Sequence, residues 1–426
     1  MSNSRDFPKI FRLRQRFDSA CIKDVSAEVQ RQLAALNLSE KVRPGHSVAI
    51  TAGSRGIANI AEITRAIVEH FMRLGAQPFL VPAMGSHGGG TVEGQRQVIE
   101  SYGITEKLVG CPIRSSLETV EICRSEHGFP VHFDKLAFQA EHVLVLNRVK
   151  PHSGFHGPIE SGLMKMLLIG LGNCEGARIY HRAILDHSFE QIVHSVAEKV
   201  ISACPILAGV AIVENAYDKT ALIEAVAPHD FEAREKELLI LAKKLMPRLP
   251  FDSVDVLVID RMGKDISGVG VDPNVVGRKF NDHKAVEGES PKVRRICLRS
   301  LTRASHGNAT GMGMAEFCKS EFLRQADPVA TRFNCLVSGH VAAAMPPLDF
   351  EKDRDMLYAA LGTIGLVEPT NAKLIWIPDT LHLDEVECSA AYLDEAQHRD
   401  DLEIITTPRE LPFDATGNLP DLTVEQ

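Results

Sequence analysis

Short apolar segments alternate along the chain with longer amphipathic ones, and this alternation carries most of the structural information. Brief runs rich in Val, Ile and Leu are typical of strands buried in a parallel sheet. Apolar residues recurring every three or four positions predict helices. The expected strands are 46–53, 77–85, 141–149, 208–215 and 254–262, and the expected helices are 59–76, 93–102 and 231–246.

The order of these segments predicts the α/β fold class with two main domains. We expect a larger N-terminal domain with a mainly parallel sheet over residues 1–262, and a smaller C-terminal α/β domain over residues 263–395, facing it across a cleft. The C-terminal segment 396–426 is polar and dotted with prolines, so we expect it to pack back or to lie loose. A length of 426 residues agrees with more than one core.

Composition removes several classes of protein. The chain is 44% hydrophobic and 24% charged, as in ordinary globular proteins. No apolar run is long enough for a membrane span and the start lacks a signal-peptide core, which predicts a cytoplasmic protein. Nine scattered cysteines without a CxxC pair argue against a disulfide framework or a zinc ribbon. A formal charge of −9 argues against a nucleic-acid partner, and the basic stretch RLRQR near the start is interpreted as a solvated face.

Three glycine-containing loops follow predicted strands: GSRG (53–56), GSHGGG (85–90) and KPHSGFHG (150–157). In open parallel sheets, ligands bind where loops leave the carboxyl ends of the strands. Gly53, Ser54 and Arg55 would make a workable phosphate or carboxylate site, although an ordinary glycine turn explains the same residues.

Histidines recur in the other two loops, as His87, His152 and His156. A single histidine in such a turn is more often structural, whereas imidazoles converging on one sheet edge serve as acid/base pairs or metal ligands. Lys165 lies in the apolar stretch GLMKMLLIGLGN, either as a desolvated nucleophile or as a lysine at a helix edge. His181 follows. No HExxH, GxSxG, Walker or GxGxxG motif accompanies these residues.

Five of these residues, in this order and with these intervals, resemble the lactate racemase family of nickel-pincer nucleotide enzymes: Arg55, His87, His152, Lys165 and His181. The resemblance covers residues from about 45 to 280. It implies that Lys165 is joined through a thioamide to a pyridinium mononucleotide whose sulfurs and ring carbon hold nickel, with His181 as a further nickel ligand. Soft sulfur donors with an imidazole suit nickel better than magnesium or calcium.

The resemblance also assigns the remaining roles. The loop with Gly53, Ser54 and Arg55 would hold the cofactor phosphate or orient the substrate. His87 and His152 would be the catalytic acid/base pair, one on each face of the substrate carbon, since an imidazole titrates near working pH.

The segment VDPNVVGRK (271–279) resembles the family's entry into its smaller domain, but with Gly277 where the family has glutamine and Phe280 where it has lysine. Candidate substrate-binding residues are therefore Asn274, Arg278, Lys279 and His156. These departures leave the substrate open, and a longer or more polar 2-hydroxy acid, such as a sugar acid, is as consistent with them as lactate.

The sequence thus predicts an isomerase, a racemase or epimerase of a 2-hydroxy acid, that works by reversible hydride transfer to the nickel-pincer nucleotide. The expected partners are a small hydroxy acid and the proteins that make the cofactor, with no nucleic acid and no membrane. Two alternatives stay open: a nucleotide-binding, metal-dependent hydrolase or phosphoryl-transfer enzyme, and a cofactor carrier without turnover.

Overall fold

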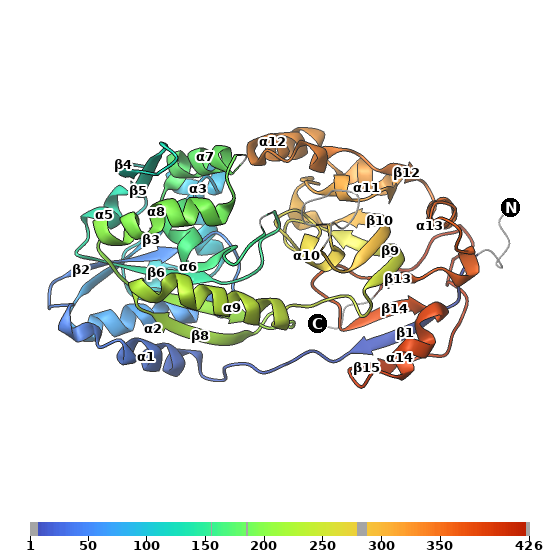
Figure 1. Ribbon diagram of the computed structural model, residues 1–426, viewed down its shortest axis with the longest axis horizontal. Coiled ribbons are helices and arrows are strands. Elements are labelled where there is room, and N and C mark those ends of the chain that lie inside the picture. The colour runs from blue at the N-terminus through green and yellow to red at the C-terminus, as the bar shows by residue number, and fades with distance from the viewer. Residues whose placement is uncertain (1–6, 155, 185, 279–287, 423–426) are drawn as a thin grey trace. The chain divides into compact units, whose positions relative to one another are not determined.

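The computed structural model describes residues 7–154, 156–184, 186–278 and 288–422, without the side chains of residues 181, 337 and 338. The chain forms two compact units (Figure 1). Ser19–Met246 form the five-stranded unit, and the chain before residue 19 joins the chain after residue 246 in the eight-stranded unit. The boundary expected after residue 262 falls one strand later than this division. The three-part domain scheme stays a prediction.

The five-stranded unit is built on a mainly parallel sheet in the order β3-β2-β6-β7-β8, in which only β8 runs antiparallel to its neighbour. Its strands are β2 (Ser47–Ala52), β3 (Gln77–Pro82), β6 (His142–Arg148), β7 (Ile206–Glu214) and β8 (Thr220–Val226). A separate hairpin joins β4 (Thr119–Arg124) to β5 (Pro130–Asp134). The expected parallel sheet is therefore confirmed.

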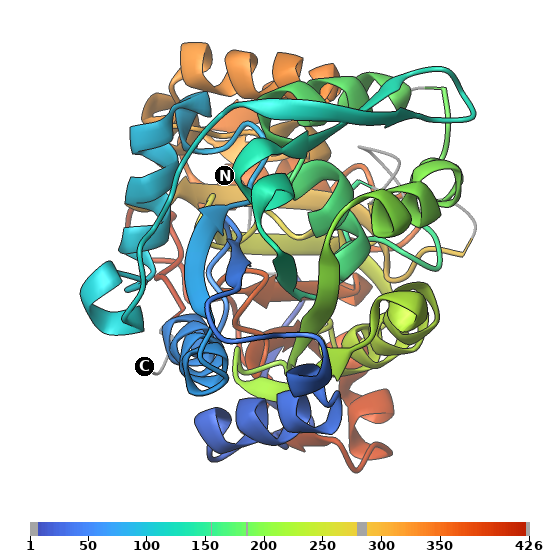
Figure 2. The ribbon, with the colours of Figure 1, turned by 90° about the vertical axis from the view of Figure 1, so that its left-hand side faces the viewer.

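Helices cover both faces of this sheet, because successive strand residues point to opposite sides. Val48 and Ile50 of β2 face the core beneath α1 and α2, whereas Ala49 faces the core beneath α6 to α9. Figure 2 shows the blue and the green helices on different sides of the strands. The helices are α1 (Val25–Ala35), α2 (Ile60–Arg73), α3 (Val92–Ser101), α4 (Glu106–Val109), α5 (Lys135–Gln139), α6 (Gly162–Lys165), α7 (Asn173–Ala183), α8 (Phe189–Ala203) and α9 (Phe231–Leu245).

The eight-stranded unit has the order β12-β11-β10-β9-β13-β14-β1-β15, parallel from β12 to β13 and antiparallel beyond. Its strands are β1 (Ile10–Gln15), β9 (Ser253–Met262), β10 (Lys292–Leu301), β11 (Phe317–Lys319), β12 (Leu348–Phe350), β13 (Leu374–Ile377), β14 (Glu385–Ser389) and β15 (Leu402–Ile404). Its helices are α10 (Pro273–Val276), α11 (Ser320–Gln325), α12 (Pro328–Ser338), α13 (Asp353–Leu361) and α14 (Leu393–Gln397).

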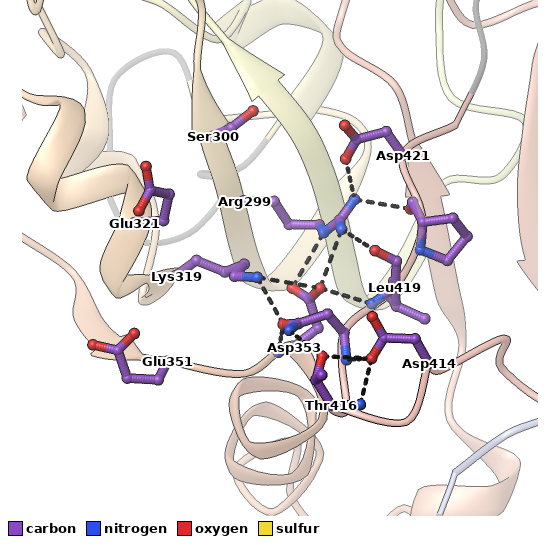
Figure 3. A network of polar contacts seen from close by, with 12 residues as sticks. Arg299, Ser300, Lys319, Glu321, Glu351, Asp353, Asp414, Thr416, Leu419 and Asp421 are labelled. Carbon is purple, nitrogen blue, oxygen red and sulfur yellow. Dashed lines mark hydrogen bonds and ion pairs between the residues drawn. The ribbon is translucent and has the colours of Figure 1, made fainter.

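A buried arginine fastens the C-terminal segment to this sheet (Figure 3). Arg299 of β10 donates to the carboxylates of Asp260 at 2.5 Å and Asp353 at 3.1 Å. It also donates to the carbonyl oxygen of Leu419 at 2.5 Å and lies 3.0 Å from the carboxylate of Asp421. The final described residues are therefore tied to charged groups inside the unit.

None of the described helices combines the length and apolar composition that crossing a membrane requires.

Candidate functional site

The three glycine-containing loops all leave the same edge of the five-stranded sheet. The loops follow β2, β3 and β6, which are adjacent and parallel in the order β3-β2-β6. The chain passes from β2 to β3 on one side and returns to β6 on the other, so the strand order reverses between β2 and β6. Ligands of open α/β sheets bind at this reversal, outside the carboxyl ends of the strands.

Two of the loops meet directly through their side chains. The Ser54 hydroxyl is hydrogen-bonded to Nδ1 of His87, and a guanidinium nitrogen of Arg55 lies 3.4 Å from the same ring nitrogen. The hydroxyl of Tyr102 donates to the carbonyl oxygen of Ser54 at 3.0 Å. His87 is exposed. Because a hydroxyl either donates or accepts, Ser54 supports both neutral tautomers of His87.

The third loop is held by an ion pair between the buried Glu160 and the exposed Lys243. The backbone N–H of His152 donates to Glu160 at 2.8 Å, and the other carboxylate oxygen of Glu160 lies 2.7 Å from the amine of Lys243 on α9. Nδ1 of the half-buried His152 accepts from the N–H of Gly154 at 2.9 Å, which puts the proton of the neutral ring on Nε2. His156 is exposed.

Lys165 ends α6 and is partly buried. Desolvation, followed by the nearby charge of Arg55, lowers the pKa of its amine to about 7. The next residues, Met166–Gly170, form a π-helical turn, a rare feature that occurs frequently at functional sites. A substantial fraction of the amine is therefore neutral at neutral pH, as a nucleophile requires.

Close packing joins these loops to the segment that carries Lys165. A Cβ on Gly53 would lie 3.2 Å from the methyl group of Met166, and a Cβ on Gly85 would lie 3.1 Å from Cβ of Ala177 on α7. Glycine lets both loops approach this segment. The structure thus brings together Gly53, Ser54, Arg55, His87 and the residue after Lys165.

His181 belongs to α7, and its side chain lies outside the described part of the structure. Its role as a nickel ligand therefore stays a prediction. Among the side chains that are described, no group of three His, Cys, Asp or Glu residues is arranged to hold a metal ion.

The candidate substrate residues of the eight-stranded unit have local partners. Asn274, at the start of α10, donates to the carboxylate of Asp272 at 2.9 Å. Arg278 is buried and donates to Glu316 at 2.9 Å and to the carbonyl oxygen of Val293 at 2.9 Å. A carboxylate-binding role for Arg278 stays a prediction, and it would require some of these bonds to break. Lys279 lies outside the described residues.

Sequence reasoning missed Glu235, which supports the start of the Lys165 helix. Its carboxylate accepts from the N–H of Met164 at 3.0 Å, and burial raises its pKa to about 8. A Cβ on Gly162 would lie 2.6 Å from this carboxyl carbon. The available signal was the position of Glu235 on the apolar face of α9, between the buried Phe231 and Leu238.

Comparisons with known proteins identify the fold. No protein-family model and no curated protein matches the sequence. Among solved structures, the lactate racemase apoprotein from Thermoanaerobacterium thermosaccharolyticum is similar, with a TM-score of 0.55 and 12% identity. The match covers 89% of this chain and 95% of that one. The two proteins share a fold. This shared fold includes the α/β class expected from the sequence.

Proposed function

We propose that the chain is a racemase or epimerase of a small 2-hydroxy acid. It would depend on a nickel-pincer nucleotide bound beside the carboxyl ends of β2 and β6 in the five-stranded sheet. The observation that carries the proposal is the amine of Lys165, whose pKa of about 7 is set by desolvation and by Arg55 at this edge. The fold shared with a lactate racemase apoprotein supports the same proposed function.

The described residues fit such a cofactor. Arg55 provides positive charge for an anionic nucleotide, and Gly53 lets its loop pack against Met166, next to Lys165. Lys165 would be the attachment point and His181 a nickel ligand. When bound, the cofactor would supply the hydride acceptor for the substrate carbon.

The two histidines would handle the hydroxyl proton. His87 is oriented by Ser54, and His152 is held by the clamp that Glu160 forms with Lys243. In the proposed reaction, one ring would take the hydroxyl proton of one enantiomer as its carbon gives up hydride. The other ring would return a proton to the carbonyl oxygen when hydride is added back on the opposite face of the flat keto acid. The two rings are carried by different loops, which would let them take such opposed positions.

The test uses the full chain produced together with the proteins that make the cofactor. We expect the intact mass to show an adduct that disappears in Lys165→Ala, and nickel to co-purify with the wild-type protein. A chiral assay over a panel of 2-hydroxy acids should show inversion. Activity in protein that carries neither adduct nor nickel would overturn the proposal.

Variants of the two histidines separate chemistry from loading. His87→Ala and His152→Ala should retain the adduct while turnover falls by about 10² to 10⁴, the usual contribution of a general acid or base. His229→Ala is the matched control, because this ring is exposed and pairs with the adjacent Asp230. Release of phosphate would favour the hydrolase or phosphoryl-transfer alternative. Protein that carries the adduct but inverts none of the hydroxy acids would favour the cofactor carrier.

A further inference from the structure

The eight-stranded sheet also reverses its strand order. From β9 the chain proceeds to β10, β11 and β12 on one side, and then returns to place β13 on the other side of β9 (Figure 1). These strands are parallel. The carboxyl ends of β9 and β13 therefore form a second place where an open α/β sheet binds ligands.

A buried carboxylate occupies this reversal. Asp379 follows β13 and is 2% exposed. One of its oxygens lies 2.7 Å from Nδ1 of His382 and accepts the N–H of Leu381 at 2.9 Å. The other oxygen accepts from the guanidinium of Arg261, near the end of β9, at 3.1 Å. Asp379 thus bridges the two strands that flank the reversal.

The two basic side chains retain access to solvent. The Arg261 side chain is 41% exposed and that of His382 is 43% exposed. Burial by itself would raise the pKa of Asp379, but the hydrogen bond and charge of His382 outweigh it, so the pKa of this carboxyl is lowered. Asp379 therefore remains ionised and fixes both bases.

The same loop is tied to the segment that the sequence singled out. The N–H of Asp272, which caps the helix beginning at Pro273, donates to the hydroxyl of the buried Thr380 at 3.0 Å. Asn274 therefore belongs to the neighbourhood of this reversal. The guanidinium of Arg278, in contrast, is buried and engaged with Glu316.

We propose that Arg261 and His382, oriented by Asp379, bind the carboxylate of a small organic acid at the β9/β13 reversal. A guanidinium held by a buried acid can offer charge-assisted hydrogen bonds to such an anion, and a neighbouring imidazole N–H can add another hydrogen bond. The inference rests on the proposed function in one respect, the expectation that the bound carboxylate belongs to a hydroxy acid. The site itself needs neither nickel nor the nucleotide.

The test is a ligand-observed NMR titration of the full-length apoprotein with lactate. We expect Arg261→Gln and His382→Asn each to weaken lactate binding about tenfold or more, the usual effect of losing a hydrogen bond to a charged group. Matched controls in the same unit are Arg324→Gln, an exposed arginine paired with Glu321 and Glu351, and His398→Asn, an exposed histidine. Both controls should bind lactate as the wild type does.

The probe chemistry decides the ligand class. Lactamide, which lacks the carboxylate, should not bind. Equal affinity of inorganic phosphate and lactate would overturn the assignment to carboxylates, and unchanged lactate binding in both Arg261→Gln and His382→Asn would overturn the site. The titration uses apoprotein and does not depend on formation of the adduct. A missing adduct would therefore reject the proposed function without rejecting this site.

Discussion

Buried charge is handled differently in the two units, although both sheets contain a reversal of strand order. In the eight-stranded unit, Arg299 is paired with Asp260 and Asp353, and all three are almost fully buried. In the five-stranded unit, desolvation is the largest cause of the shifted pKa values of Lys165 and Glu235. Paired charges anchor a chain, whereas groups brought near neutrality by desolvation are typical of reactive sites.

Removing the buried arginine should give the largest stability effect. Arg299→Ala leaves the carboxylate of Asp260 without its cation and that of Asp353 with only Lys319, at 3.7 Å, so we expect the free energy of unfolding to fall by about 3 to 5 kcal/mol in urea denaturation. Arg324→Ala, which breaks only exposed pairs, should cost less than about 1 kcal/mol. Equal losses in the two variants would contradict a special role for the buried network.

Glycines of the two units should respond unequally to an added methyl group. Gly277 has a φ of 68°, and its Cβ would lie 1.8 Å from the carbonyl oxygen of Pro291, so Gly277→Ala should cost about 1 to 3 kcal/mol in the same assay. A Cβ on Gly53 would meet only the flexible end of Met166 at 3.2 Å. Gly53→Ala should cost less stability but reduce formation of the adduct. An unchanged free energy of unfolding in Gly277→Ala would contradict this close approach of Pro291.

The pH dependence of stability should separate the two kinds of buried charge. The folded pKa of Glu235, about 8, exceeds its ordinary value of 4.5, so the folded state binds more protons between these values and its stability falls as the pH rises through them. The slope from this group is at most about 1.4 kcal/mol per pH unit. Glu235→Gln should remove that slope in urea denaturation, whereas Glu237→Gln, on the exposed face of the same helix, should retain it.

The contribution of Lys165 to the pH dependence of stability should have the opposite sign to that of Glu235. Its folded pKa of about 7 lies below its ordinary value of 10.5, so the unfolded state binds more protons between these values. Stability of the apoprotein should therefore rise with pH across this window, and Lys165→Met should abolish the rise. An unchanged profile in Lys165→Met would show that this amine is not desolvated.

The smallest expected effect concerns the orientation of one ring. Ser54→Ala removes the hydroxyl bonded to Nδ1 of His87, and a single hydrogen bond of this kind corresponds to roughly a fivefold change in turnover. The chiral assay measures it on loaded protein. Ser101→Ala, an exposed serine that bonds only locally to the carbonyl oxygen of Val98, is the control.

Much of the central architecture could be predicted because its signals are local. The run HSVAITAG became β2, and the charged amphipathic segment at 231–246 became α9. Its charge alone predicts that the basic stretch RLRQR is a solvated face. In the structure this stretch includes most of β1, where Arg12 and Arg14 alternate with buried residues. Arg12 donates to Glu387, which lies 375 residues away in the sequence, and no local pattern reveals such a pair.

The candidate site was predictable where a loop follows a strand, because glycine and polar residues mark those positions. The loops of Ser54 and His87 are of this kind, and the structure joins them. The supporting groups were not predictable, since Glu160 meets Lys243 only after β6 and α9 have come together. Asp379 was likewise hidden, because its significance depends on a strand order that the sequence does not display.

The placement of β1 between β14 and β15 has a consequence for biosynthesis. During translation β1 emerges before β14 and β15, which follow hundreds of residues later, whereas Ser19–Met246 are complete well before that. We therefore expect β1 to stay unpaired, and open to wrong edge pairing, until the end of the chain has been made.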